Sequence, residues 1–245
     1  MITIFRNLFA PPKHLILLVI AAWIGLTLAE KRAERHGLSK DHLNNLIFYG
    51  IVAFIIGGRV SFVLQNIPTF TKSLLDIFSI NPDLFDSFGA LTITLIAMII
   101  YGQRHNLALW PTLDALTPFF AIISVGLGLS HLAAGTAFGS PTKLPWAIDL
   151  WNAKRHPTQI YEVLASLLTF CLLWFKKPSL HPGLTFLSFT SLTAGWQLFI
   201  GGFRSSNILI LNVLHQDQVA AWFVLMACFV LYEFRLKQEK QKSMY

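Results

Sequence analysis

The sequence has few charged residues and almost no cysteine. Asp, Glu, Lys and Arg together make up 13% of its 245 residues, about half of their share in a typical soluble domain. Its two cysteines, Cys171 and Cys228, both lie inside apolar runs, so we read them as small core residues and not as a disulfide or metal pair. The sequence contains no Cys-x-x-Cys, His-Glu-x-x-His or glycine-rich phosphate loop. A disulfide-stapled secreted domain and an ordinary cytosolic enzyme are therefore excluded.

Apolar and aromatic residues, in contrast, are abundant. Residues of the set Ala, Val, Ile, Leu, Met, Phe, Trp, Tyr and Cys make up 54% of the chain, and the mean hydropathy is +0.58. A soluble fold could not bury so much apolar surface, so much of the chain is expected to lie in a bilayer. The net charge of +7 is typical of basic residues that flank membrane spans and meet anionic lipids. Because these charges lie in short loops and at the C-terminus, we expect no nucleic-acid binding.

Seven apolar runs approach the roughly 20 residues that a spanning helix needs. We therefore predict an all-α membrane protein, a single seven-helix domain over residues 1–245. The predicted spans are Leu15–Ala29, Leu46–Leu64, Leu84–Tyr101, Leu113–Gly135, Gln159–Phe175, Gly183–Phe203 and Val219–Phe234.

The orientation of these spans follows from the basic residues between them. Eleven Lys and Arg residues fall on one side of the predicted bilayer and seven on the other. By the positive-inside rule, the N-terminus lies outside and the C-terminus inside. The two longest loops, at about 65–83 and 136–158, then face outward, and the basic tail 235–245 lies in the cytoplasm.

Arg59 lies within the second predicted span, roughly 9 Å below its outer end. A charge at that depth is costly and usually has a purpose, so Arg59 is a candidate ligand for an outer-leaflet phosphate or a partner for an acid. The alternative is a basic anchor whose side chain reaches back to the interface. The flanking Gly57 and Gly58 predict a close approach of another helix.

A polar string, Arg155-His156-Pro157-Thr158-Gln159-Ile160-Tyr161-Glu162, opens the fifth span. The free N–H groups of a helix first turn favour an anion, and Arg155 adds a fork-shaped phosphate ligand. Continued as a helix, Arg155, Gln159 and Glu162 fall along one stripe. Glu162 enters the membrane and needs a partner, which Arg59 or Arg155 could be. We predict a ligand site here, and the alternative is a structural ion pair.

Two more candidates lie near the outer ends of other spans. A neutral imidazole at His131 could act as a general base near neutral pH, and a hydrogen-bonded core histidine is the alternative. Arg204 ends the sixth span, where it either adds a phosphate ligand or marks the interface. The small residues Gly126 and Gly128 predict helix contact beside His131.

Several strings of this sequence resemble the bacterial prolipoprotein diacylglyceryl transferase family in order and spacing. They are Gly139-Ser140-Pro141-Thr142, Leu144-Pro145-Trp146-Ala147, the Arg155 to Glu162 string, Lys31 to Leu38 and Gly57 to Leu64. The family is similar in having seven spans, an outside N-terminus and an inside C-terminus. The resemblance implies a bacterial plasma-membrane enzyme that transfers the diacylglyceryl group of phosphatidylglycerol to the lipobox cysteine thiol of a prolipoprotein. Glycerol phosphate leaves, and no metal or organic cofactor is used.

Together with the residues above, the resemblance gives a set of expected site residues. The catalytic candidates are His131, His156, Tyr161 and Glu162, and the candidates for binding phosphate or lipid are Arg59, Gly139, Arg155, Gln159 and Arg204. The expected partners are phosphatidylglycerol, a prolipoprotein lipobox peptide and membrane lipids.

The sequence departs from the family pattern in the fourth and sixth spans. The fourth-span signature Gly-Arg-x-Gly-Asn-Phe-x-Asn-Gly-Glu falls on Leu127 to Thr136, so that Gly128 replaces an Arg, His131 an Asn and Thr136 a Glu. In the sixth span, Gln197 and Gly201 stand where Arg and Glu are expected. Three hypotheses follow: a divergent transferase with His131 or His156 as base, an inactive relative that binds lipid or a lipoprotein precursor, or a small-solute transporter or channel. A transporter needs a continuous polar path, and the inner halves of the predicted spans are too apolar for one.

Overall fold

Helices dominate the fold, as the sequence predicts. The computed structural model describes residues 1–71, 74–78, 84–176, 181–205, 209–210 and 214–242. These residues form two compact units, which we call the larger unit (Met1–Arg32 with Leu113–Tyr245) and the smaller unit (Ala33–Thr112). Parts of the predicted 65–83 loop and of the basic tail, including Lys72 and residues 243–245, lie outside the described residues.

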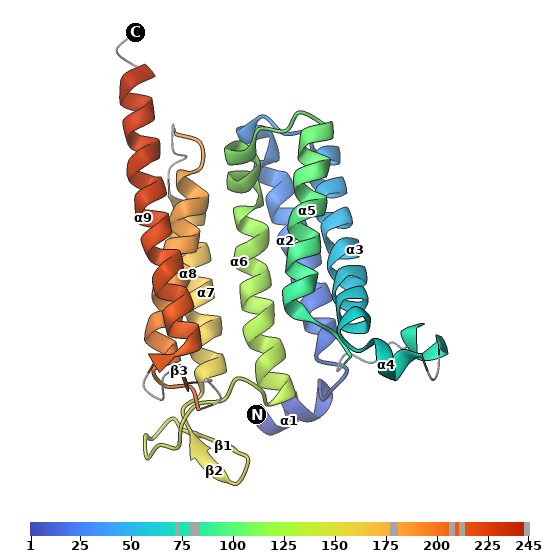
Figure 1. Cartoon of the computed structure of the whole chain (residues 1–245). Coiled ribbons are helices and arrows are strands. Elements are labelled where there is room, and N and C mark those ends of the chain that lie inside the picture. Colours follow the sequence, from blue (N-terminus) through green and yellow to red (C-terminus); the bar gives the residue numbers. More distant parts are fainter. Residues whose placement is uncertain (72–73, 79–83, 177–180, 206–208, 211–213, 243–245) are drawn as a thin grey trace. The chain divides into compact units, whose positions relative to one another are not determined.

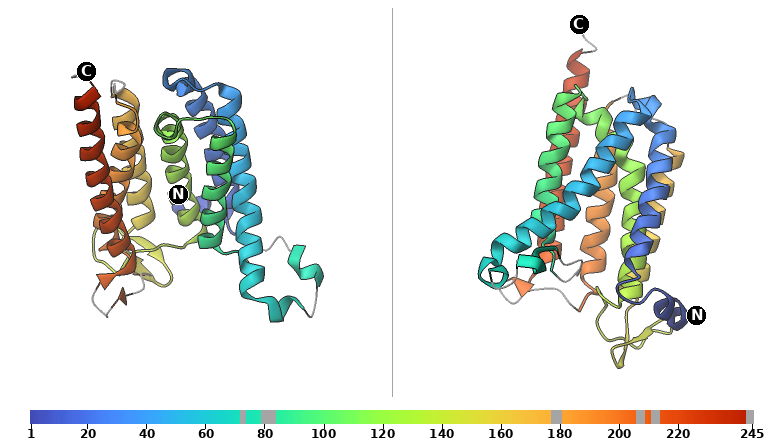
Figure 2. Two further views of the ribbon diagram at one scale, coloured as in Figure 1. Left: turned by 45° about the horizontal axis from the view of Figure 1, so that its top comes forward. Right: turned by 90° about the vertical axis from the view of Figure 1, so that its right-hand side faces the viewer.

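The elements of the larger unit are mostly long helices (Figure 1). They are α1 (Ile2–Leu8), α2 (Leu15–Ala33), α6 (Leu109–Ala134), α7 (Thr158–Phe175), α8 (Leu184–Gly201) and α9 (Gln216–Lys242), with two hairpins made of β1 (Ile148–Leu150) and β2 (Ala153–Arg155), and of β3 (Leu209–Ile210) and β4 (Leu214–His215). Helices α7, α8 and α9 lie side by side in Figures 1 and 2. The smaller unit contains η1 (Glu34–His36), α3 (Lys40–Gln65), α4 (Ile67–Phe70), η2 (Leu74–Phe78) and α5 (Ser87–Arg104).

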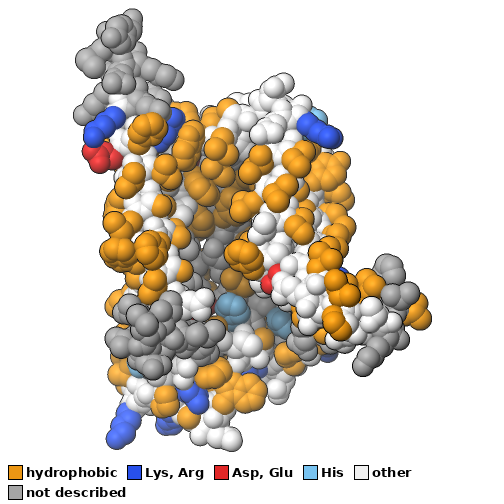
Figure 3. Space-filling view, in the orientation of Figure 1, with side chains coloured by type: hydrophobic (Ala, Val, Ile, Leu, Met, Phe, Trp, Pro, Cys, Tyr) orange, Lys and Arg blue, Asp and Glu red, His pale blue; other side chains and the backbone are white. Residues whose placement is uncertain are grey.

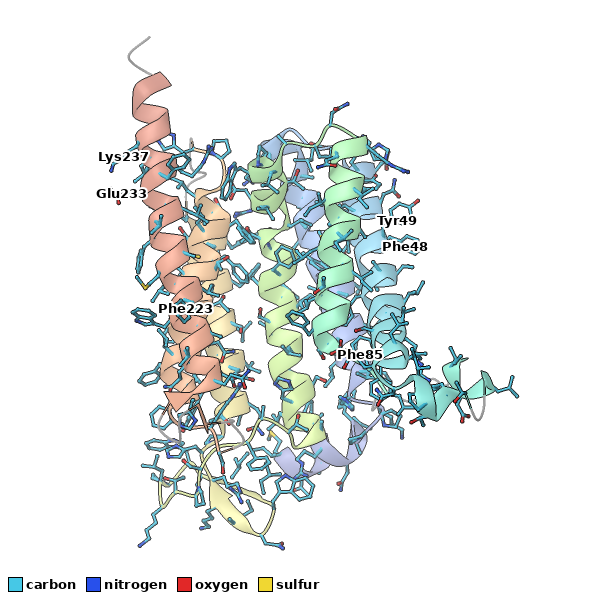
Figure 4. The ribbon with its side chains drawn as sticks, in the orientation of Figure 1. Phe48, Tyr49, Phe85, Phe223, Glu233 and Lys237 are labelled. Atoms are coloured by element: carbon cyan, nitrogen blue, oxygen red, sulfur yellow. The ribbon has the colours of Figure 1, made fainter. Side chains whose placement is uncertain are left out.

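Within the described residues, five helices are long and apolar enough to cross a membrane: α3, α5, α6, α7 and α9. Figure 3 shows apolar side chains covering the outward faces of α9 in the larger unit and of α3 and α5 in the smaller unit. Exposed Phe223 on α9 and Phe48 on α3, labelled in Figure 4, belong to these surfaces. In water such surfaces would be unfavourable, whereas a lipid environment solvates them. The chain is therefore an α-helical, multi-pass membrane protein.

Two polar side chains join helices at one end of the larger unit. Asp114 of α6 is only 3% exposed, and its carboxylate accepts hydrogen bonds from the backbone N–H groups of Gly183 (2.6 Å) and Phe186 (2.8 Å). It thereby caps the N-terminus of α8 from a different helix, as an anion does favourably. Arg32 of α2 donates to the Leu173 carbonyl at 3.3 Å and to the Trp174 carbonyl, at the C-terminus of α7.

Helices α3 and α5 pack closely in the smaller unit, because glycines of α3 face large side chains. A Cβ atom on Gly57 would lie 2.7 Å from the Ile93 Cβ, and one on Gly58 would collide with the Phe85 ring. The predicted role of these glycines in close helix approach is confirmed. Phe85 lies beside α3, as Figure 4 shows.

The hairpin β1–β2 lies within the predicted 136–158 loop. Ile148 pairs with Arg155 and Leu150 with Ala153, and the turn residues Trp151 and Asn152 have φ angles of 54° and 58°. Two consecutive positive φ angles are typical of the tight two-residue turn that joins the strands of a β-hairpin. The turn lacks the usual Asn-Gly or Asp-Gly pair, so the sequence does not predict this hairpin.

Candidate functional site

A buried carboxylate is the centre of the site. Glu162 lies in the second turn of α7, and its side chain is 8% exposed. Its Oε2 lies 3.2 Å from Nδ1 of His131 in the last turn of α6, and its Oε1 forms an ion pair with Nη2 of Arg204. Burying a lone carboxylate would be costly, so these two partners are what allow Glu162 to lie inside the protein.

Arg204 extends this network to α9. It follows α8, and its backbone pairs with Gly139 in an isolated antiparallel bridge. Its Nη1 lies 3.5 Å from Oδ2 of Asp217 in the first turn of α9. Burial lowers the pKa of the Arg204 guanidinium and the Asp217 carboxylate opposes this shift, so the group stays charged at neutral pH. Alternating charges therefore run from Glu162 through Arg204 to Asp217.

The network borders a cavity of about 290 Å³ in the larger unit. Besides His131, Glu162 and Arg204, this cavity is lined by Ser124, Leu127, Gly128, Ala165, Ser166, Thr169, Thr193, Trp196, Gln197 and Ile200. A second cavity, of about 410 Å³, lies between α8 and α9 and shares Thr193, Gln197 and Arg204 with the first. Ligand pockets typically combine such apolar walls with a few charged groups.

Gly128 contributes to the site by its lack of a side chain. A Cβ atom there would lie 2.8 Å from a methyl group of Val163, so α6 and α7 meet closely at this point. The predicted helix contact at Gly128 is confirmed. A long cationic side chain could not lie here without moving α7, which agrees with the absence of an arginine at this position.

Arg155 is not part of the helix that follows it. It belongs to β2, and α7 begins only at Thr158, so the predicted stripe of Arg155, Gln159 and Glu162 on one helix is wrong at Arg155. The reason is Pro157, because the residue before a proline, here His156, is biased away from helical backbone, which separates Arg155 from the helix. The Arg155 guanidinium donates to the carbonyls of Leu150 (3.1 Å) and Gly139 (3.3 Å) and thus stabilises the hairpin.

Gly139 and Gln159 also contribute to the backbone frame of the site. A Cβ atom on Gly139 would collide with the carbonyl group of His156, so only glycine allows the two backbone segments to approach this closely. Gln159 is fully buried, and its Nε2 donates to the Thr136 carbonyl at 2.8 Å. This hydrogen bond links the start of α7 to the segment that follows α6.

His156 and Tyr161 lie in an aromatic group beside the network. The Tyr161 hydroxyl accepts a hydrogen bond from Trp146 Nε1 at 2.8 Å and lies 3.5 Å from His156 Nδ1. The His156 ring packs against Phe203, with 5.0 Å between ring centroids. Neither residue lines the two cavities described above.

Arg59 belongs to the smaller unit. Its guanidinium donates to the backbone carbonyls of Ile77 (2.8 Å), Leu84 (2.7 Å) and Asp76, and thereby links α3 to η2 and to the residue at position 84 before α5. Among the described residues the arginine paired with Glu162 is Arg204, whereas the sequence suggested Arg59 or Arg155 as candidates. Both of those arginines donate to main-chain carbonyls instead.

The sequence reasoning missed Asp217 and the pairing of Arg204 with Glu162. Asp217 lies two residues before the predicted span Val219–Phe234, and its position at the start of an apolar run is a helix N-terminus signal that could have marked it. Among the described residues, no group of three or more His, Cys, Asp and Glu side chains is arranged to hold a metal ion.

The fold and the site define a class: an α-helical membrane protein with a buried histidine–carboxylate–arginine network on a cavity. Comparison with known families makes this specific. The family described as prolipoprotein diacylglyceryl transferase matches residues 13–233, and the chain belongs to this family.

Several relatives match most or part of the chain. A phosphatidylglycerol–prolipoprotein diacylglyceryl transferase of Finegoldia magna is 25% identical over 228 residues, which is 92% of this chain and 90% of the relative. That of Thermotoga maritima is 27% identical over 243 residues, 93% of this chain and 82% of the relative. That of a Marinomonas species is 34% identical over 162 residues, 62% of this chain and 59% of the relative.

Proposed function

We propose that this protein transfers the diacylglyceryl group of phosphatidylglycerol to the cysteine thiol of a prolipoprotein lipobox. The observation that carries the proposal is the cavity bordered by His131, Glu162 and Arg204. It combines a candidate base, an oriented carboxylate and a cation, which are the groups that this reaction needs. The names of the relatives support the same activity and the same two substrates.

We also propose that the chain has seven spans, with the N-terminus outside and the C-terminus in the cytoplasm of a bacterial plasma membrane. Helices α2 (19 residues) and α8 (18 residues) are the two further spans. At 1.5 Å per residue they are about 27–29 Å long, close to the thickness of a bilayer core. The eleven-to-seven distribution of Lys and Arg supports this orientation.

In the proposed reaction, His131 takes the proton from the thiol, whose pKa is otherwise about 8.5. Its contact with Glu162 favours the tautomer with the proton on Nδ1, which makes Nε2 the proton acceptor. The thiolate forms a carbon–sulfur bond to the glyceryl carbon that carries the phosphate. The carbon–oxygen bond breaks, and the electron pair leaves with glycerol phosphate. Arg204 stabilises the negative charge that develops on that phosphate.

The other candidate residues act around this centre. His156 and Tyr161 form a histidine–hydroxyl pair beside the network. His131 is favoured as the base over His156 because His131 lines the cavity. Arg155, Gly139 and Gln159 shape the backbone that holds Arg204 and the start of α7. Arg59 belongs to the smaller unit, where it donates to the backbone carbonyls of Ile77 and Leu84, and we assign it no role at this centre.

A lipidation assay tests the proposal. Purified full-length protein is mixed with phosphatidylglycerol and a fluorescent lipobox peptide, and the peptide's gain of diacylglyceryl mass is followed. We expect turnover by the wild type. His131→Gln should lower the rate about 10²–10⁴-fold because it removes the base. Arg204→Ala should lower it by a similar factor of about 10²–10³.

The matched control is His156→Gln, which removes a second histidine from the same end of the larger unit. Retained turnover in this variant would assign the base to His131, and equal loss in both would contradict that assignment. A wild type that gives no mass shift beside an active relative would overturn the transferase proposal. The chain would then be a lipid- or precursor-binding relative.

A further inference from the structure

The N-terminal segment reaches the same end of the larger unit as the site. Figures 1 and 2 show α1 beside the C-terminal end of α6. Helix α6 is followed by Gly135, which has a φ angle of 68°. The atom nearest to the position of a Cβ on Gly135 is Nη2 of Arg6, at 3.3 Å. The Arg6 guanidinium therefore lies against the end of α6, four residues after His131.

Two nitrogen atoms of this segment are buried and have no hydrogen-bond partner among the residues that the structure describes. They are Nε of Arg6 and Nδ1 of His14, and Nε of Arg204 is in the same condition. Leaving a buried donor unpaired costs roughly 1–3 kcal/mol, and more for a charged group. In native proteins such groups are nearly always satisfied, by protein, water or a ligand. The Arg6 and His14 nitrogens are therefore free to donate to an acceptor supplied by a ligand.

His14 is close enough to the site for its charge to interact with that of His131. Burial lowers the pKa of His14, and the neighbouring His131 lowers it further. His14 stands directly before α2, so it approaches the end of α6 from another element. The segment before α2 thus supplies both a cation, Arg6, and an imidazole donor, His14.

The charges around the site show which ligand this arrangement favours. Arg204 is paired with Glu162 and Asp217, so these carboxylates offset part of the positive charge that it offers to a phosphate. Arg6 has no ion pair with any carboxylate in the described part of the chain. Arg6 therefore carries a charge that no carboxylate among the described residues offsets through an ion pair, and a group that is anionic and rich in acceptors would satisfy it.

We propose that Arg6 and His14 bind the phosphate group of the lipid substrate beside the His131–Glu162 pair. This inference rests on the proposed function and adds two residues to its substrate site. The guanidinium of Arg6 binds two phosphate oxygens, and His14 donates from Nδ1 to the same group. These residues supply positive charge in place of the arginine that the family pattern has at the position of Gly128.

A lipid-binding measurement tests this inference without any turnover. Binding of short-chain phosphatidylglycerol and of short-chain diacylglycerol, which lacks the phosphate, is measured on the purified full-length protein in detergent. We expect Arg6→Ala to weaken the affinity for phosphatidylglycerol about tenfold and to leave that for diacylglycerol unchanged. His14→Gln should act in the same direction with a smaller factor. The matched control is Lys13→Ala, which removes an exposed cation of the same segment.

The outcomes separate this inference from the proposed function. If Arg6→Ala retained the wild-type preference for phosphatidylglycerol, or lost both lipids equally, the inference would be overturned, and Arg6 would act only as a cation at the C-terminus of α6. If the inference were overturned in this way and Arg6→Ala still transferred lipid at the wild-type rate, the transferase proposal would remain valid without it. A wild type with no preference for phosphatidylglycerol over diacylglycerol would overturn this inference, whereas the transferase proposal would be overturned by a wild type without turnover in the lipidation assay.

Discussion

Asp86 shows how one ionisable group controls the start of a helix. It is the N-cap of α5 and accepts hydrogen bonds from the Ser61 hydroxyl at 2.6 Å and from the Gly89 N–H at 2.9 Å. The Ser61 hydrogen bond is the main reason that the pKa of Asp86 lies below its ordinary value of 3.8. The folded state therefore stabilises the ionised carboxylate of Asp86 more than the unfolded state does.

A pH dependence of stability follows at this residue. Because the pKa of Asp86 is lowered on folding, its contribution is present above the ordinary value and is lost as the pH falls through the lowered one. We expect thermal unfolding in detergent, measured from about pH 6 to about pH 3, to show a loss of stability that is smaller in Asp86→Asn. Identical slopes in wild type and variant would contradict this assignment, and Ser61→Ala should reduce the slope partly.

At the scale of elements, the packing of α3 on α5 depends on a glycine surface. We expect Gly58→Ala to destabilise the smaller unit by about 1–3 kcal/mol, because the new methyl group meets the Phe85 ring. Gly102→Ala is the matched control in α5, since nothing lies within 4 Å of its Cβ position. That change should be neutral or stabilise by up to about 1 kcal/mol. Denaturation of both variants in detergent measures the difference, and equal effects would argue against the proposed packing.

The elements also show which predictions the sequence could support. Apolar runs located the helices because a spanning helix has a recognisable length and composition, and glycines marked the close contacts. The helical spacing of Gln159 and Glu162 does not extend back to Arg155, because Pro157 biases the residue before it, His156, away from helical backbone. Glu162 and Arg204 are 42 positions apart, and no local pattern in a single sequence shows that two such residues form a pair.

At the scale of the whole molecule, the orientation in the bilayer can be measured directly. On a background with Cys171→Ala and Cys228→Ala, the variants Lys143→Cys and Lys40→Cys each place one thiol at an exposed loop or helix start. We expect a membrane-impermeant maleimide to label the Lys143→Cys variant in intact cells. The Lys40→Cys variant should be labelled only after permeabilisation, because it lies on the side with more Lys and Arg. The reverse pattern would place the N-terminus in the cytoplasm.

The position of α1 has a practical consequence for handling the protein. An affinity tag fused before Met1 would be attached to a seven-residue helix whose Arg6 lies against the end of α6. A tag after Tyr245 would extend from α9, whose C-terminal end in Figure 1 lies at the opposite end of the larger unit from α1. A C-terminal tag should therefore leave the contact of Arg6 with the end of α6 unchanged, whereas an N-terminal tag extends the helix that carries Arg6.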